Sequence, residues 1–233
     1  MVTGILAVLA LGGLLGFRHA FEPDHLAAVS TLASRPGPSS LWSVARLGLA
    51  WGLGHTVTVG AVALLVLALG VRVPASLWPS AELAVAGLLI LLGGTVVWRY
   101  ARGRWHMHLH AHEADRHFHL HSHAQDTGHA HAHGRADARR SLGFGVAHGL
   151  AGSGAIAVLL VAAAPTAGLR VAYFAAFGAG TIAGMLAVTL ALGSLVRVAS
   201  AKGARWATAL HLGSACVSVL AGIVLAQRVL FGG

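Results

Sequence analysis

Length, composition and charge describe a chain with very few charged side chains. It has 233 residues, of which 56% are hydrophobic and 10% charged, whereas soluble domains carry about 25% charged residues. The formal net charge of +9 arises because acids are scarce, 7 against 16 Lys and Arg, so it does not indicate a nucleic-acid partner. A single cysteine excludes a disulfide framework. This composition predicts an all-α polytopic membrane protein.

The first apolar run, from about residue 3 to 33, contains a dense polar cluster. Two histidines and two carboxylates lie within seven positions there: His19, Glu22, Asp24 and His25. A charged side chain at the centre of a membrane helix costs about 2.5–3.5 kcal/mol on insertion scales, so such residues are rare and usually functional. Histidine with carboxylate suits borderline divalent metals. The cluster predicts a metal site, and the alternative is a polar collar at the membrane interface.

Pro23 lies inside this cluster and predicts a broken or kinked first span. The run is too long for one straight span of about 20 residues and too short for two. Proline removes a helical hydrogen bond and disfavours helix at the preceding residue. An unwound turn could direct His19, Asp24 and His25 toward one point. Irregular backbone at membrane depth is tolerated where it lines a protein cavity, as in transporter sites.

Five further apolar runs complete the predicted architecture. They cover about 42–70, 80–98, 141–164, 169–196 and 206–230, which gives six transmembrane helices. We expect residues 1–98 to form a first three-helix repeat, 99–140 a His-rich loop, and 141–233 a second three-helix repeat.

The two halves resemble each other weakly. His19 corresponds to His148, Ala50–His55 to Ala176–Thr181, and Gly93–Arg99 to Gly222–Arg228. Repeats of three spans must be inverted relative to each other, which is a common transporter design. We therefore predict a 3+3 inverted repeat, and chance similarity between helices rich in Gly, Ala and Leu is the alternative.

The central segment carries eleven of the sixteen histidines, mostly as His-x-His. Such a tract cannot bury a core and predicts a mobile loop. Imidazole binds Ni, Co, Cu and Zn in its neutral form, so binding there should weaken as pH falls through about 6.5. We expect a cytoplasmic buffer, sensor or delivery site, or else a solvated linker that transport does not need. The candidate secondary ligands are His106, His108, His110, His112, His117, His119, His121, His123, His129, His131 and His133.

Basic residues predict the orientation. The side that holds the N-terminus has few basic residues in its connecting segments, whereas the opposite side has many: Arg35, Arg99, Arg102, Arg104, Arg116, Arg135, Arg139, Arg140, Arg197, Lys202 and Arg205. The positive-inside rule makes the second side cytoplasmic. We expect a multi-pass inner (plasma) membrane protein with both termini outside and the His-rich loop inside. A cytoplasmic metallochaperone and a second copy of the chain are candidate partners.

Two further histidines lie inside predicted spans. His55 is mid-span without an acid nearby in sequence, and His148 begins a run of small residues. A lone intramembrane histidine is as often a helix–helix hydrogen-bond donor as a ligand. We include both in the predicted metal site. Thr181, by contrast, is expected to serve a helix interface.

Two motifs resemble those of the nickel/cobalt transporter (NiCoT) family. His19, followed after four residues by Asp24-His25, is similar to the family signature His-x4-Asp-His, and Leu53–Thr56 is similar to its second-helix Gly-His-Ser/Thr element. The resemblance implies His19, Asp24, His25 and His55 as metal ligands and nickel or cobalt as the substrate.

The chain departs from the larger members of that family at two places. Glu22-Pro23 stands where they carry an acid followed by alanine, and Gly145–Gly154 replaces a polar, acidic segment. The second difference resembles the small, six-helix, urease-accessory-like branch of the superfamily.

No P-loop occurs in the sequence, nor a His-Glu-x-x-His protease motif, so we predict a secondary carrier and not an enzyme. The metal would be its substrate, with no permanent cofactor. An inside-negative potential of 100 mV favours entry of two charges by about 4.6 kcal/mol, which slightly favours uptake of Ni²⁺ or Co²⁺ over efflux. The alternatives are a Ni, Co or Zn efflux carrier, a metal sensor or storage protein built on the loop, and a haem-binding electron-transfer protein with axial ligands among His19, His55, His148 and His211.

Overall fold

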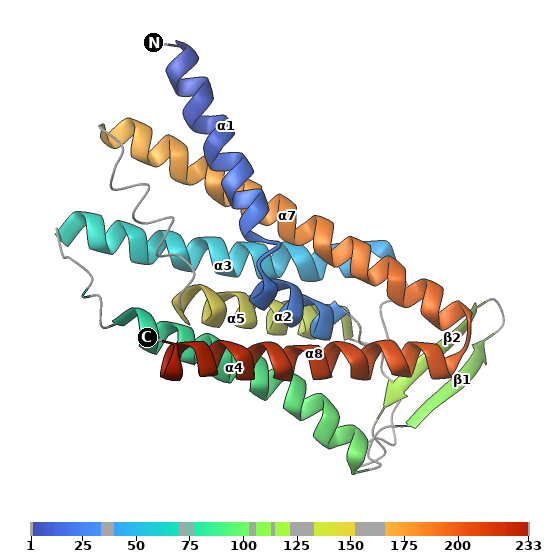
Figure 1. Cartoon of the computed structure of the whole chain (residues 1–233). Helices are drawn as coiled ribbons and strands as arrows, with labels where there is room; N and C mark the ends of the chain where they lie inside the picture. The colour runs from blue at the N-terminus through green and yellow to red at the C-terminus, as the bar shows by residue number, and fades with distance from the viewer. Residues whose placement is uncertain are drawn as a thin grey trace.

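The computed structural model describes residues 2–33, 40–69, 74, 77–102, 106–112, 115–121, 133–151 and 166–232. Within these ranges the chain forms long helices and one two-stranded antiparallel sheet (Figure 1). The helices are α1 (Val2–His19), α2 (Pro23–Ala33), α3 (Leu41–Leu69), α4 (Leu77–Ala101), α5 (His133–Ala151), α7 (Ala167–Ala201) and α8 (Ala204–Phe231). The strands are β1 (His106–His112) and β2 (Asp115–His121).

The helices have the length and composition of membrane spans. In the described part of the chain, α3, α4, α7 and α8 are each long and apolar enough to cross a membrane, and α1 with α2 qualifies as one bent pair. Large apolar side chains such as Leu14, Leu64 and Val171 are about 70% exposed on the outer surface, as expected where lipid replaces water. The protein is therefore a helical membrane protein. The predicted fourth span falls partly on α5 and partly on residues outside the described ranges.

The predicted break in the first span is confirmed. Helix α1 ends at His19, α2 begins at Pro23, and the two are bent by 58°. Proline suits the first position of a helix because its fixed φ is helical and its missing N–H has no partner there. The Glu22 carbonyl accepts the first hydrogen bond of α2, from the Leu26 N–H at 3.0 Å. Pro23 therefore starts a second helix, besides ending the first.

Helix α2 lies inside the helix assembly. It packs against α7 and α8, and Ala27, Ala28 and Val29 are at most 3% exposed. The Thr31 hydroxyl donates a hydrogen bond to the Ser214 carbonyl of α8 at 3.1 Å. The second half of the broken span is thus held by protein on the face that carries His25, which is fully buried, whereas Pro23 and Leu26 in the same turn are exposed.

Three helix pairs make the closest contacts: α1 with α7, α3 with α5, and α4 with α8 (Figure 1). Each contains glycines whose missing side chain allows two backbones to touch. A Cβ atom on Gly16 would collide with the Phe177 carbonyl, and one on Gly145 with the Trp51 carbonyl. Close approach at small residues is a general basis of helix association in membranes. It sets the distance between the two helices and therefore the position of the side chains next to the glycines.

The His-rich segment has more regular structure than the loop expected over 99–140. Strands β1 and β2 pair with His106 opposite His121, His108 opposite His119 and His110 opposite His117. A residue type that recurs at every second position has the period of a strand, whereas the expectation of a loop rests on the overall composition of the tract. Helix α5 also begins at His133, before the apolar run at 141, because Ala and Arg favour helix there.

Candidate metal centre

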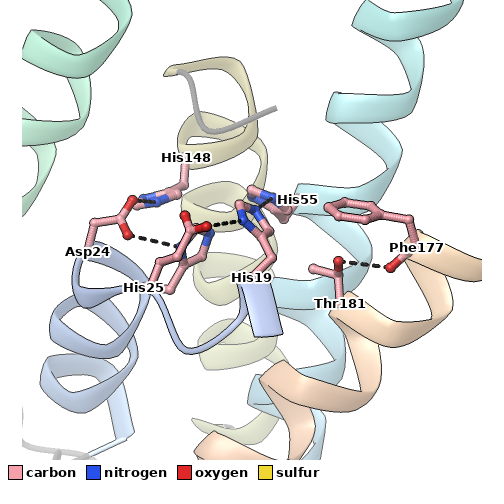
Figure 2. A network of polar contacts seen from close by, with 8 residues as sticks. His19, Asp24, His25, His55, His148, Phe177 and Thr181 are labelled. Carbon is pink, nitrogen blue, oxygen red and sulfur yellow. Dashed lines mark hydrogen bonds and ion pairs between the residues drawn. The ribbon is translucent and has the colours of Figure 1, made fainter. Parts of the chain in front are cut away.

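Four buried histidines from four different helices meet at the break between α1 and α2. His19 ends α1, His25 lies in the first turn of α2, His55 lies midway along α3, and His148 lies on α5. His19 is 6% exposed and the other three are at most 1% exposed. Figure 2 shows their rings directed toward one another, with Asp24 on the α2 side.

One set of ligand atoms consists only of imidazole nitrogens. His19, His25 and His55, here called the three-histidine group, can each offer a nitrogen such that all three atoms lie within 4.8 Å of one another. The Nε2 atoms of His19 and His55 are 3.2 Å apart. Two nitrogens bound at about 2.0–2.1 Å to one tetrahedral or octahedral ion are about 2.9–3.4 Å apart. The spacing of this pair therefore already suits a shared metal ion.

A second set contains the carboxylate. Asp24, His25 and His148, here called the aspartate group, also have ligand atoms within 4.8 Å of one another. Asp24 Oδ1 is 3.1 Å from His25 Nδ1, and Asp24 Oδ2 is 3.0 Å from His148 Nε2 (Figure 2). One carboxylate thus bridges two histidines from helices far apart in sequence.

Carboxylates also orient the histidines. Glu22 Oε1 is 3.1 Å from His19 Nδ1, so that nitrogen donates its proton and Nε2 keeps a lone pair. Asp24 has the same relation to His25, whose Nε2 is buried without a hydrogen-bond partner among the described residues. Carboxylate–histidine pairs of this kind fix the ring and raise its basicity toward a metal. The predicted acids therefore contact the histidines that they were grouped with.

Two aromatic residues not selected from the sequence border the centre. The Trp51 ring lies 5.7 Å from the His148 ring, and the Phe177 ring lies 5.6 Å from the His19 ring, both between centroids. These residues occupy corresponding places in the weak internal repeat, which is the signal that could have identified them. They leave the nitrogens of the cluster in apolar surroundings.

Other predicted residues lie elsewhere. Thr181 is fully buried beside the centre, and its hydroxyl donates to the Phe177 carbonyl of its own helix at 2.9 Å (Figure 2). His211 is buried on α8 and belongs to neither group. The side chains of the eleven loop histidines lie outside the residues whose side chains the structure describes. Their role in metal binding stays a prediction, as does that of the cluster.

No protein-family model matches the chain, and no solved structure does. The chain is similar to the urease accessory protein UreH of Bacillus sp. (strain TB-90), with 31% identity over 189 residues. These residues make up 81% of this chain and 77% of that relative. Identity at this level over most of both chains shows the family, and the chain therefore belongs to the UreH family of urease accessory proteins.

Proposed function

We propose that this protein carries a divalent transition-metal ion, Ni²⁺ or Co²⁺, across the membrane as a secondary carrier. The observation that carries this proposal is the convergence of four buried histidines and Asp24 at a broken membrane helix. Polar groups in the membrane interior commonly mark ion pathways, and broken helices commonly build transporter sites.

The chemistry of the centre supports a borderline metal. Imidazole suits Ni, Co, Cu and Zn, whereas Mg²⁺ and Ca²⁺ take oxygen ligands. The relative's name concerns urease assembly, which favours nickel, as does the resemblance of His19, Asp24, His25 and His55 to the nickel/cobalt transporter motifs. The membrane potential favours uptake over efflux. We place both termini outside and the His-rich hairpin in the cytoplasm, where it would meet a metallochaperone.

We also propose that the two halves form an inverted repeat with its interface at the centre. The glycine contacts support this, because each has a counterpart at the corresponding positions of the other half. Gly16 against Phe177 corresponds to Gly145 against Trp51, Gly54 against Leu142 to Gly180 against Gly13, and Gly93 against Ala215 to Gly222 against Ala86.

Ring contacts follow the same correspondence. Phe177 on His19 matches Trp51 on His148, so that each half supplies one aromatic wall to a histidine of the other half. Paired contacts of this kind favour a repeat over chance similarity between Gly-rich helices.

The geometry disfavours the haem alternative. Two axial histidines of one haem lie on opposite faces of the macrocycle, whereas His19 and His55 are in direct hydrogen-bond contact at 3.2 Å. Of the other two candidates, His148 contacts Asp24 through Nε2 at 3.0 Å, and His211 belongs to neither ligand group of the described residues. Purified protein is therefore expected to show no Soret band.

Nickel flux into proteoliposomes separates a carrier from a storage protein. We expect the full chain with all eleven loop histidines changed to asparagine to retain most of its flux, because the buried cluster is intact. His19→Ala should reduce flux at least about 10-fold, since loss of a direct ligand costs at least as much as loss of an outer partner. The reverse pattern would assign the function to the loop and refute the carrier.

Glu22 is expected to tune the affinity. In Glu22→Gln the partner of His19 Nδ1 loses its charge, and outer-shell substitutions cost about 10–100-fold in metal affinity. The Ni²⁺ concentration for half-maximal flux should therefore rise about 10-fold with little change in the maximal rate. Glu82→Gln, which changes an acid on α4 outside both ligand groups, is the matched control and should leave both quantities unchanged. If Glu22→Gln leaves the Ni²⁺ concentration for half-maximal flux unchanged, Glu22 does not contribute to the metal site.

A further inference from the structure

The His25 ring lies midway between two histidines that correspond in the repeat. Its centroid is 4.6 Å from that of His19 and 4.4 Å from that of His148. It is also the one residue common to the three-histidine group and the aspartate group. The two groups therefore contain different ligands around one shared ring.

The two nitrogens of His25 have different surroundings. Nδ1 contacts Asp24 at 3.1 Å, on the side of the aspartate group. Nε2 is buried and has no hydrogen-bond partner among the described residues, which leaves its lone pair available to an ion held by His19 and His55. One imidazole can thus serve an ion on either side through a different nitrogen, provided that its single proton moves: it stays on Nδ1, toward Asp24, while Nε2 binds the ion, and it is carried by Nε2 while Nδ1 binds the ion.

We propose that the two groups are successive stations for one ion, with His25 as a ligand at both. The ion is held first by His19, His25 and His55 and then by Asp24, His25 and His148, or in the reverse order during transport in the other direction. This inference rests on the proposed carrier function and specifies the path of the ion through the centre.

Charge favours one ion at a time. The two groups together contain a single carboxylate, Asp24, and the nearby Glu22 is 41% exposed at its side chain. Two divalent ions that share one ring would leave a net positive charge among apolar walls, which is unfavourable in a medium of low dielectric constant. The two stations are therefore not occupied by metal ions at the same time.

The aspartate group lies beside Trp51, which lines a small pocket. The His148 ring lies against Trp51, and Trp51 lines a small pocket with Val29, Leu32, Leu47, Ser141 and Thr189. The indole Nε1 of Trp51 is buried without a hydrogen-bond partner in the described part of the chain. The aspartate group is thus connected through Trp51 to a pocket lined by residues of α2, α3, α5 and α7.

Separate measurements of binding and flux test the two stations. Binding of Ni²⁺ is titrated on the full-length chain with the eleven loop histidines changed to asparagine, so that only the buried cluster reports. Flux is measured in proteoliposomes with and without those changes. His55→Ala alters only the three-histidine group, His148→Ala alters only the aspartate group, and His211→Ala removes a buried histidine outside both.

We expect the parent protein to bind one Ni²⁺. His55→Ala should lose at least about 10-fold in affinity, whereas His148→Ala should bind within about 3-fold of the parent and lose at least about 10-fold in flux. His211→Ala should retain both. If His148→Ala is not recovered as monodisperse protein, His148→Gln replaces it, because the glutamine amide can still donate to Asp24.

Two outcomes would overturn the proposal of two successive stations without contradicting the proposed carrier function. If the His148 variant loses as much affinity as His55→Ala, all the ligands hold one ion at one station. If it retains both affinity and flux, the aspartate group is not on the path. A parent protein that binds Ni²⁺ but moves neither Ni²⁺ nor Co²⁺ would refute the proposed carrier function itself.

Discussion

His25→Ala is expected to abolish transport and to weaken Ni²⁺ binding at the buried cluster about 100-fold or more. Outer-shell substitutions at metal sites already cost about 10–100-fold, and His25 is a member of both ligand groups. Its loss leaves two ligands in either group and removes one of the two histidine partners of Asp24, which keeps its contact with His148. Flux of Ni²⁺ and of Co²⁺ into proteoliposomes measures the effect, with binding titrated in the background that lacks the loop histidines.

The matched control is His211→Ala, which removes a buried histidine of similar exposure from α8. It should transport at the rate of the parent if it folds. Normal transport by His25→Ala would show that the convergence of histidines at the helix break serves only packing.

Gly145→Ala is expected to reduce the amount of folded protein. A Cβ atom at this position would collide with the Trp51 carbonyl oxygen and lie 3.1 Å from the backbone nitrogen of His55. Overpacking typically costs about 1–3 kcal/mol, and here the obstacle is backbone, which cannot move aside as a side chain can. The shift of α5 would also displace His148, which is on the same helix.

Gly143→Ala provides the control on the same helix. A Cβ atom there has no neighbour within 4 Å, and alanine is favoured over glycine in a helix by about 1 kcal/mol. The thermal midpoint of detergent-solubilised protein should therefore fall for Gly145→Ala and stay equal or rise for Gly143→Ala. Equal midpoints would contradict the close contact between α3 and α5.

The sequence allowed the broken span to be predicted because its causes are local. Pro23 acts on its own backbone and on the preceding residue, and His19 with Glu22 lies one helical turn apart, a separation that the 3.1 Å contact reflects. The scarcity of acids outside the loop directed attention to Glu22 and Asp24. None of these local causes depends on how distant helices pack.

The contact of Asp24 with His148 could not be predicted in the same way. It joins residues 124 positions apart and depends on how closely α5 approaches α3, which Gly145 and Gly54 determine through backbone contact. The internal repeat identified His148 as a candidate but not its partner. The strand pairing in the His-rich segment has a sequence signal, because apolar residues alternate with histidine in both strands, at Met107, Leu109, Phe118 and Leu120. The expectation of a loop there rests on composition alone and does not use this period.

The unequal exposure of the ligands has a consequence for how an ion loses its water. The side chains of Glu22 and Asp24 are 41% and 19% exposed, whereas those of His25 and His148 are fully buried. In the proposed carrier, an ion that reaches the centre from its exposed side meets these carboxylate oxygens before the buried nitrogens, so its hydration shell is exchanged in stages. Mg²⁺, which gives up water reluctantly and requires oxygen ligands, would find no replacement beyond the first stage. Discrimination against the abundant cellular cation then arises from the order of dehydration, without any need for a narrow pore.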